Sequence, residues 1–191
     1  MGGSVPKQFL ALGGEPLVVH SLRVLQNSPV IHEIILAVPV ADLDYCLNDL
    51  AVRYGFSKIT RVVAGGKERQ DSVRHALEHV PVETDIVVVH DAVRPFLTLD
   101  IVAHVVEAAR RVGGAIVALP MRDTVKQVGN NHHIERTVDR GPLWLAQTPQ
   151  AFRRDRLLDA HRKAHADGVR ATDDAFLFEW AGHPVVVVEG S

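Results

Sequence analysis

The stretch VVVHDAVRPFL, residues 87–97, decides the fold class of this chain. Its valines belong to a longer run, DIVVVHDA (85–92), that is apolar on both faces. Such a run is typical of a strand in a parallel sheet that is covered by helices on both sides. The run ends in His90 and Asp91, and Arg94 follows shortly after. Because ligands of open α/β sheets bind at the carboxyl ends of the strands, we expect a ligand site here.

Short β-branched runs and amphipathic runs alternate along the rest of the chain. This alternation predicts an α/β fold with a doubly wound, Rossmann-like and mostly parallel sheet. Thr98 and Thr172 are the expected N-caps of two of the helices. We expect strands at 31–39, 60–66, 85–92, 115–120 and 185–189, and helices at 15–27, 42–55, 67–80, 98–114, 152–168 and 172–182.

The alternation breaks at residues 121–141. Two short polar–apolar runs there flank Gly129-Asn130-Asn131, which predicts a β-hairpin that protrudes from the sheet. A two-stranded arm buries little core of its own, so we expect a partner subunit to cover it. The sequence thus predicts a single domain over residues 1–191, with 121–141 as a dimerisation arm.

Composition narrows the class of protein. The chain has 191 residues, 47% of them hydrophobic, and a formal net charge of −2. This suits one well-packed domain and gives no electrostatic footprint for nucleic acid or a membrane. No stretch approaches the roughly 20 apolar residues of a membrane span, and the N-terminus lacks the apolar core of a signal peptide. The single cysteine, Cys46, is expected to be a buried small hydrophobe. We expect a cytoplasmic location, or the plastid stroma if the source is a plant.

Several polar residues fall at the expected sheet edge. Gly65 and Gly66 precede a helix whose first turn holds Arg69, which suits an anion but also an ordinary turn. Asp91 suits Mg²⁺ bound together with substrate phosphates, or a turn cap. Arg94 suits bidentate phosphate contact, or a surface salt bridge. Taken singly, each of these residues leaves both interpretations open.

Other candidates are weaker when taken one at a time. Lys7 precedes an apolar segment, Arg140 ends TVDR, and Thr148 begins a TPQ segment that is expected to be an ordinary turn. The sequence has no nucleophile elbow, CxxC, HExxH or Walker A motif. Scattered cations with one strand-end carboxylate therefore favour phosphorus chemistry without a covalent enzyme intermediate. We expect His132 and His133 to be exposed at the hairpin tip, and Trp144 and Trp180 to lie in the core.

The order and spacing of several strings, taken together, resemble one known family. The strings are VPKQFL, AGGKERQDSV, VVVHDAVRPFL, PMRDTVK, TVDRGPLWLAQTPQAF and ATDDAFLFE. The series covers nearly the whole chain and is similar to the methylerythritol-phosphate cytidylyltransferases of the non-mevalonate isoprenoid pathway. The resemblance implies a fold of the nucleotide-diphospho-sugar transferase type. It also implies a homodimer that uses Mg²⁺ to transfer CMP from CTP to 2-C-methyl-D-erythritol 4-phosphate, with release of pyrophosphate.

The resemblance also implies a role for each matching residue. Lys7 would stabilise charge on the α-phosphate, and Arg140 would position the attacking phosphate. Asp91 would bind Mg²⁺ and help to place the substrate. The nucleotide would be bound by Gly65, Gly66, Arg69 and Ser72, and the polyol phosphate by Asp91, Arg94, Thr124, Thr148 and Thr172, with Thr124 and Arg140 contributed by the arm of the partner subunit.

The sequence departs from the family pattern at both ends. The family begins with a strand and a glycine-rich loop around the triphosphate, of which Met1-Gly2 matches only the tail, and it continues beyond Ser191. If the molecule ends where the sequence does, we expect weak turnover and poor stability.

Two alternative functions remain at this point. One is the related ribitol-5-phosphate cytidylyltransferase, which TVDRGPLWLAQTPQ and ATDDA disfavour. The other is an inactive nucleotide-binding scaffold of the same fold.

Overall fold

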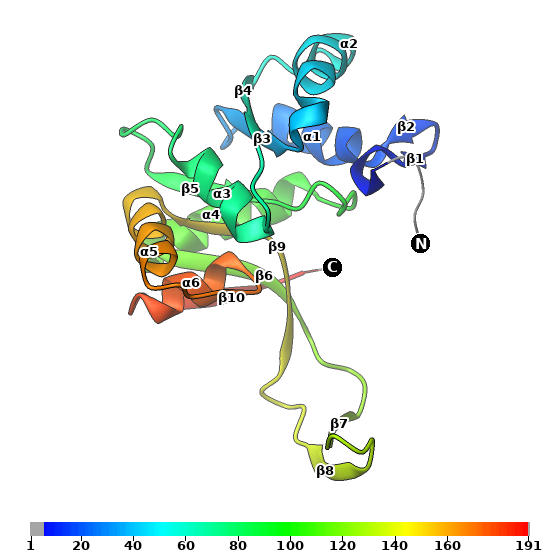
Figure 1. Cartoon of the computed structure of the whole chain (residues 1–191), viewed down its shortest axis with the longest axis vertical. Helices are drawn as coiled ribbons and strands as arrows, with labels where there is room; N and C mark the ends of the chain where they lie inside the picture. Colours follow the sequence, from blue (N-terminus) through cyan, green and yellow to red (C-terminus); the bar gives the residue numbers. More distant parts are fainter. Residues whose placement is uncertain (1–5, 191) are drawn as a thin grey trace.

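The computed structural model describes residues 6–190 as a mixed α/β fold with a projecting arm (Figure 1). Helices and strands follow one another along most of the chain, as the sequence predicts. The helices are α1 Leu17–Asn27, α2 Ala51–Tyr54, α3 Arg69–Leu77, α4 Leu99–Val112, α5 Arg154–Ala166 and α6 Asp174–Trp180. The strands are β1 Ala11–Leu12, β2 Glu15–Pro16, β3 Ile34–Val38, β4 Ile59–Ala64, β5 Ile86–Val89, β6 Gly114–Pro120, β7 Val125–Val128, β8 Ile134–Val138, β9 Trp144–Arg153 and β10 Val185–Glu189.

The main sheet has four strands in the order β10-β6-β9-β5. Strand β10 is parallel to β6, whereas β9 is antiparallel to both of its neighbours, β6 and β5. A second, two-stranded sheet pairs β3 with β4 in parallel. Within residues 6–190, neither β3 nor β5 pairs with a second strand.

The predicted single, mostly parallel sheet is therefore present only in part. Strand β9 was not predicted from the sequence, because its TPQ segment was expected to be a turn but lies inside the strand. The reason for the antiparallel pairing is the arm, because the chain leaves the sheet along β6, passes through the hairpin and returns along β9 (Figure 1). A chain that returns through a hairpin reverses its direction, so β9 must run antiparallel to β6.

Helices cover both faces of the main sheet. On one face Val105 and Ala109 of α4 pack against Ala115 and Val117 of β6. On the other face α3, α5 and α6 pack against Ile116 of β6 and Phe152 of β9. Neighbouring residues of β6 thus serve opposite layers, as the two-residue period of a strand requires. A third cluster, built mainly from α1, β3 and the π-helix Tyr45–Leu50 that precedes α2, packs against the separate β3–β4 sheet.

Helix starts follow the sequence in one case and differ in another. Thr98 caps α4 as predicted, because its hydroxyl accepts a hydrogen bond from the Ile101 N–H at 3.3 Å. For α6 the prediction of Thr172 was wrong. The cap is Asp173, whose carboxylate accepts from the Phe176 N–H at 3.0 Å. Both residue types are good N-caps, and placing the cap one residue later leaves Thr172 outside the helix.

The arm is an antiparallel hairpin of β7 and β8, with its tip at the predicted Gly129–Asn131. Figure 1 shows it extending away from the rest of the molecule. Val128 and Ile134 are exposed on it, Ile134 at 62%. His132 and His133 are exposed at the tip, as expected.

Three other expectations concern single residues. Cys46 is 2% exposed, which confirms its predicted place as a small buried hydrophobe, and burial raises the pKa of its thiol to about 11. Trp180 is half-buried against a cluster of α5 and α6. Trp144 was expected in the core but is 40% exposed, because it lies where β9 emerges from the arm. None of the helices between residues 6 and 190 has the length and apolar character that crossing a membrane requires.

Candidate functional site

A cavity of about 220 Å³ lies at the end of β5 and beside β9. Five residues that the sequence analysis assigned to a site line it, although they come from distant parts of the chain. They are Arg69 at the start of α3, Asp91 and Arg94 after β5, Thr148 in β9, and Thr172 before α6. The other lining residues are Ala146, Gln147, Gln150 and Asp173.

An irregularity in β9 places Thr148 at this cavity. Ile116 of β6 pairs with Gln150, but Ala118 pairs with Ala146, so residues 147–149 of β9 lie opposite Val117 alone. Extra residues of this kind form a bulge, which redirects side chains and accommodates a proline that cannot donate to the ladder. Pro149 lies within the bulge, and its neighbour Thr148 lies next to the loop that follows β5.

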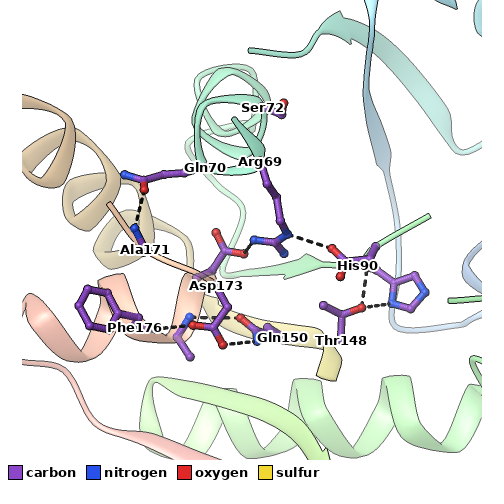
Figure 2. Close-up of polar contacts among 12 residues, drawn as sticks. Arg69, Gln70, Ser72, His90, Thr148, Gln150, Ala171, Asp173 and Phe176 are labelled. Atoms are coloured by element: carbon purple, nitrogen blue, oxygen red, sulfur yellow. Dashed lines mark hydrogen bonds and ion pairs between the residues drawn. The ribbon is translucent and has the colours of Figure 1, made fainter. Parts of the chain in front are cut away.

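Thr148 joins β9 to the end of β5. Its hydroxyl accepts a hydrogen bond from the Asp91 N–H at 3.1 Å and lies 3.1 Å from His90 Nδ1 (Figure 2). On the other side of the ring, His90 Nε2 lies 3.1 Å from the Arg94 carbonyl oxygen, which can only accept. We therefore assign the Nε2–H tautomer, in which Nδ1 accepts from the threonine hydroxyl. Burial lowers the pKa of His90, in keeping with a neutral ring.

Two guanidinium groups hold the Asp91 carboxylate. Arg69 Nε donates to Oδ1 at 3.0 Å, and Arg94 Nε lies 3.4 Å from Oδ2. Arg69 extends from α3 past the cavity, and its Nη1 donates to Oδ2 of Asp174 at 2.7 Å. The salt-bridge interpretation of Arg94 is thus confirmed, because Arg94 pairs with Asp91 at the cavity edge.

The start of α6 forms the opposite wall. Asp173 caps the helix and also accepts from Gln150 Nε2 at 2.9 Å (Figure 2). Gln150 Oε1 in turn accepts from the Ala175 N–H at 3.1 Å. Gln150 is buried and thus ties β9 to α6, while Thr172 is exposed at the mouth of the cavity.

The glycine loop after β4 forms a separate group beside α3. The Gly66 N–H donates to the Ser72 hydroxyl at 3.0 Å. A Cβ at Gly66 would lie 2.2 Å from the Cβ of Asp71, so a side chain at this position would displace the first turn of α3. Gly65, Gly66 and Ser72 do not line the 220 Å³ cavity. Of the four residues expected to bind the nucleotide, Arg69 alone reaches this cavity.

Lys7 lies on a short 3₁₀ turn, Lys7–Phe9, and its side chain is exposed. It does not line the cavity. Phe9 and Ala92 pack against the same core cluster, which puts this turn in the same region of the molecule as the end of β5. The structure thus shows Lys7 exposed and outside the cavity, and its place in the site stays a prediction.

Thr124 and Arg140 come together on the arm, away from the first cavity. They line a second, more open cavity of about 460 Å³ with Thr137, Val138 and Asp139. Both side chains are exposed, and Arg140 Nη1 contacts the Arg122 carbonyl oxygen. Within one chain, the predicted site residues therefore form two groups, one at the sheet edge and one on the arm.

The cavity residues do not form a metal site by themselves, but they can contribute ligands to a metal that is bound together with a nucleotide. Among residues 6–190, no group of three or more His, Cys, Asp or Glu side chains converges as a metal cage would require. The 220 Å³ cavity does hold two carboxylates, those of Asp91 and Asp173. Mg²⁺ typically takes one or two protein carboxylates and completes its shell with phosphate oxygens and water. These residues therefore fit a Mg²⁺ ion that arrives with a nucleotide.

Four residues at or beside the cavity were given no functional role from the sequence. His90 and Gln150 were quoted within motifs but given no role, and the acidic pair Asp173-Asp174 was treated as part of a helix start. A signal was available for Asp174, because an aspartate in the first turn of a helix that packs on a sheet has to find a partner when it is buried.

Comparison with known proteins extends these observations. A family model described as "IspD: 2-C-methyl-D-erythritol 4-phosphate cytidylyltransferase" matches residues 1–191. A 2-C-methyl-D-erythritol 4-phosphate cytidylyltransferase from Syntrophus aciditrophicus is 49% identical over 191 residues, which span 100% of this chain and 82% of the relative. The enzyme of the same name from Geobacter metallireducens is 44% identical and is covered to 83% of its length.

Solved structures agree in fold. The crystal structure of 4-diphosphocytidyl-2C-methyl-D-erythritol synthase from Anaerococcus prevotii matches with a TM-score of 0.89 at 29% identity, covering 100% of this chain and 83% of that one. The cytidylyltransferase structure from Thermus thermophilus matches with a TM-score of 0.83 at 35% identity, covering 97% and 84%. These matches confirm the resemblance seen in the sequence. The chain belongs to the 2-C-methyl-D-erythritol 4-phosphate cytidylyltransferase family.

Proposed function

We infer that this chain is a cytidylyltransferase that transfers CMP from CTP to 2-C-methyl-D-erythritol 4-phosphate, giving CDP-methylerythritol and pyrophosphate. Family membership supports the reaction, with relatives 40–49% identical over essentially the whole chain. The observation that carries the assignment to a site is the single cavity lined by Arg69, Asp91, Arg94, Thr148 and Thr172.

In this reaction the protein has to align the two substrates and stabilise the negative charge on their phosphates. The phosphate of the polyol attacks the α-phosphorus of CTP, a new P–O bond forms, and the bond to the pyrophosphate leaving group breaks. Such a transfer needs aligned phosphates and cationic groups rather than an enzyme nucleophile. Mg²⁺, when bound with the nucleotide, would neutralise phosphate charge, and Asp91 is the carboxylate we assign to it, with Asp173 close by.

The remaining roles follow from where each residue lies. Arg94 would contact phosphate from the cavity edge, and Thr148 and Thr172 would contact the polyol phosphate. The Gly65–Gly66 loop and Ser72 would hold the cytosine and ribose beside α3. Lys7 would stabilise negative charge on the α-phosphate. In this proposal the sheet belongs to a doubly wound, Rossmann-like domain whose ligands lie at the carboxyl ends of β4 and β5.

The arm is the part of the proposal that calls for a second subunit. Thr124 and Arg140 line their own cavity on an exposed hairpin, and Ile134 and Leu145 are exposed nearby. A two-stranded arm with exposed apolar residues and an unused guanidinium suits a surface that another copy of the chain covers. We propose a homodimer in which each arm brings Thr124 and Arg140 to the cavity of its partner.

The test is a pyrophosphate-release assay of the purified chain with CTP and Mg²⁺. We expect release with 2-C-methyl-D-erythritol 4-phosphate and much less with ribitol 5-phosphate. Preference for ribitol 5-phosphate would reassign the substrate. Calorimetric binding of CTP without pyrophosphate release from either substrate would instead support an inactive nucleotide-binding scaffold.

A further inference from the structure

A line of four side chains leads from the core of the molecule to the cavity. His161 Nε2 donates to Oδ1 of Asp174 at 2.9 Å, and Oδ2 of Asp174 accepts from Arg69 Nη1 at 2.7 Å. Arg69 Nε then donates to Asp91 at 3.0 Å. The four residues come from α5, α6, α3 and the segment after β5. Asp91 and Arg69 lie at the proposed site, whereas nothing in the proposed reaction uses His161 or Asp174.

Asp174 is a charged group in an apolar setting. Its residue is 1% exposed and lies among Ala175, Leu177 and Phe178 of α6, all buried. Burial by itself would raise the pKa of Asp174, but the hydrogen bond from His161 and the charge of Arg69 outweigh this and hold the pKa below its usual value. The carboxylate therefore stays ionised, and its two oxygens are divided between a core partner and a cavity partner.

His161 is the core partner and is itself fully buried, at 0% exposure. Its Nε2 faces Asp174, and its Nδ1 has no hydrogen-bond partner in the described part of the chain. A proton on Nδ1 would be a buried donor without an acceptor, so we assign the Nε2–H tautomer, which donates to the carboxylate. The histidine thus fixes one oxygen of Asp174 and leaves the other for Arg69.

Stability does not account for this arrangement. Buried ion pairs gain little over apolar residues of the same size, because desolvation offsets the attraction. The surrounding α5–α6 contact already packs through Ala160, Ala164 and Leu177. A pair that stabilises little but fixes a particular geometry is best explained by the group that it orients, and that group is Arg69.

Arg69 needs orientation because its side chain is long and lies at the cavity wall. It begins α3, and two of its nitrogens go to different carboxylates, Nε to Asp91 and Nη1 to Asp174. Without Asp174, the guanidinium could rotate to grip Asp91 with two nitrogens, as arginine–carboxylate pairs commonly do. That rotation would change the orientation in which Arg69 holds the Asp91 carboxylate at the cavity wall.

We propose that the buried His161–Asp174 pair is a positioning device for the cytidylyltransferase site, which holds Arg69 so that Asp91 keeps its orientation toward the cavity. This rests on the proposed function for the meaning of the site. His161 and Asp174 touch no substrate in this scheme and act through Arg69.

The test compares a variant that keeps the donor with one that removes it. In His161→Gln the amide can still donate from about the position of Nε2, whereas His161→Leu cannot donate. We expect His161→Leu and Asp174→Asn to lower kcat/KM by about 10–100-fold, the range known for residues that orient ligand-binding groups. His161→Gln should stay within about threefold of the wild type, since it restores the same hydrogen bond. Calorimetry with CTP and Mg²⁺ should show the same order of affinities.

A matched control separates positioning from simple loss of packing. Leu177→Ala removes a fully buried side chain from α6 without touching the pair. It should lower the melting temperature and leave kcat/KM and CTP affinity unchanged when measured well below that temperature. Equal losses of kcat/KM in Leu177→Ala and His161→Leu, at matched folded fraction, would overturn the proposal.

A double-mutant cycle tests whether the effect passes through Arg69. In an Arg69→Gln background, Asp174→Asn should cause no further loss of kcat/KM, because the group that it orients is gone. If Asp174→Asn costs the same with and without Arg69, the positioning role is refuted. If the wild type transfers CMP to no polyol phosphate, the proposed function fails. The calorimetric comparison of His161→Leu with His161→Gln still decides the positioning role in that case.

Discussion

In the cavity at the sheet edge, Thr148, His90, Asp91 and Arg69 satisfy one another through hydrogen bonds between different elements. On the arm, Thr124 and Arg140 lie exposed on one hairpin, and Arg140 contacts only the nearby Arg122 carbonyl oxygen among its described partners. The first group is preorganised by the fold of a single chain. The second has no such links between elements in the described part of the chain, and in the proposed dimer a partner subunit completes it. From this contrast we expect substitutions in the cavity network to affect both stability and function, and substitutions on the arm to affect function alone.

The largest effect should come from Lys7, which is exposed and outside both cavities. We expect Lys7→Ala to lower kcat by two to three powers of ten, roughly the loss seen when one preorganised charge-stabilising donor is removed. CTP affinity measured by calorimetry should change far less. Lys163→Ala, on the outside of α5, serves as the control for removing a lysine. Equal losses in turnover and CTP affinity would contradict a role specific to the transition state.

The arm gives the next largest effect. Arg140→Ala should raise the KM for 2-C-methyl-D-erythritol 4-phosphate by about 10–100-fold, since hydrogen bonds to charged groups contribute roughly 1.5–3 kcal/mol. The melting temperature should stay the same because the side chain is exposed. Arg136→Ala, on the same hairpin and bonded to Gln127 Oε1, is the matched control.

Mixing subunits shows where the arm acts. Lys7→Ala and Arg140→Ala chains are each strongly impaired alone when the polyol phosphate is held near the wild-type KM, and at that concentration they should regain up to about a quarter of wild-type activity when mixed and allowed to exchange. Half of the dimers are then mixed, and each of these has one site free of both substitutions if arms cross between subunits. A mixture no more active than its components would place the arm in the site of its own chain.

The contrast between the two regions also explains what the sequence could and could not predict. The run at 85–92, the glycine loop at 65–66 and the hairpin at 129–131 each have local patterns, and each is present in the structure. Strand β9 was missed because Pro149 interrupts its pattern. The bulge that accommodates this proline arises from pairing with β6, a partner some 30 residues away along the chain.

Long-range pairing likewise limited the prediction of the site. The sequence placed Asp91 and Arg94 at the end of an expected strand and singled out Thr148 only through the family resemblance, and the fold brings all three together at one cavity. It gave no sign that Arg69 would bridge Asp91 and Asp174, because that bridge depends on how α3 and α6 pack. His161 on α5 looked like any other polar residue of an amphipathic helix.

Replacing a threonine by the isosteric valine should lower the free energy of unfolding more in the cavity than on the arm. Thr148 is 9% exposed, and Thr148→Val removes the hydroxyl that pairs with the Asp91 N–H and His90 Nδ1. We expect a loss of about 1–3 kcal/mol in the free energy of unfolding, the usual cost of an unsatisfied buried group. Thr137→Val on the exposed arm, where the hydroxyl meets Lys126 Nζ, should change it by less than about 0.5 kcal/mol. Urea unfolding of both variants is the measurement, and equal losses would show that the cavity network carries no more stability than the arm.

The smallest effect should be on how the free energy of unfolding falls at acidic pH. The folded pKa of Asp174 is lowered, so the unfolded chain binds a proton to this residue more readily than the folded chain does. Its contribution is therefore complete above the ordinary aspartate pKa of about 4 and is lost as pH falls through the lower folded value. Between pH 5 and pH 3 the wild type should lose more unfolding free energy than Asp174→Asn, while Asp139→Asn on the exposed arm should follow the wild type. Parallel curves for the wild type and Asp174→Asn would mean that the buried carboxylate is not held ionised by His161 and Arg69, and the cavity would then be no more preorganised than the arm.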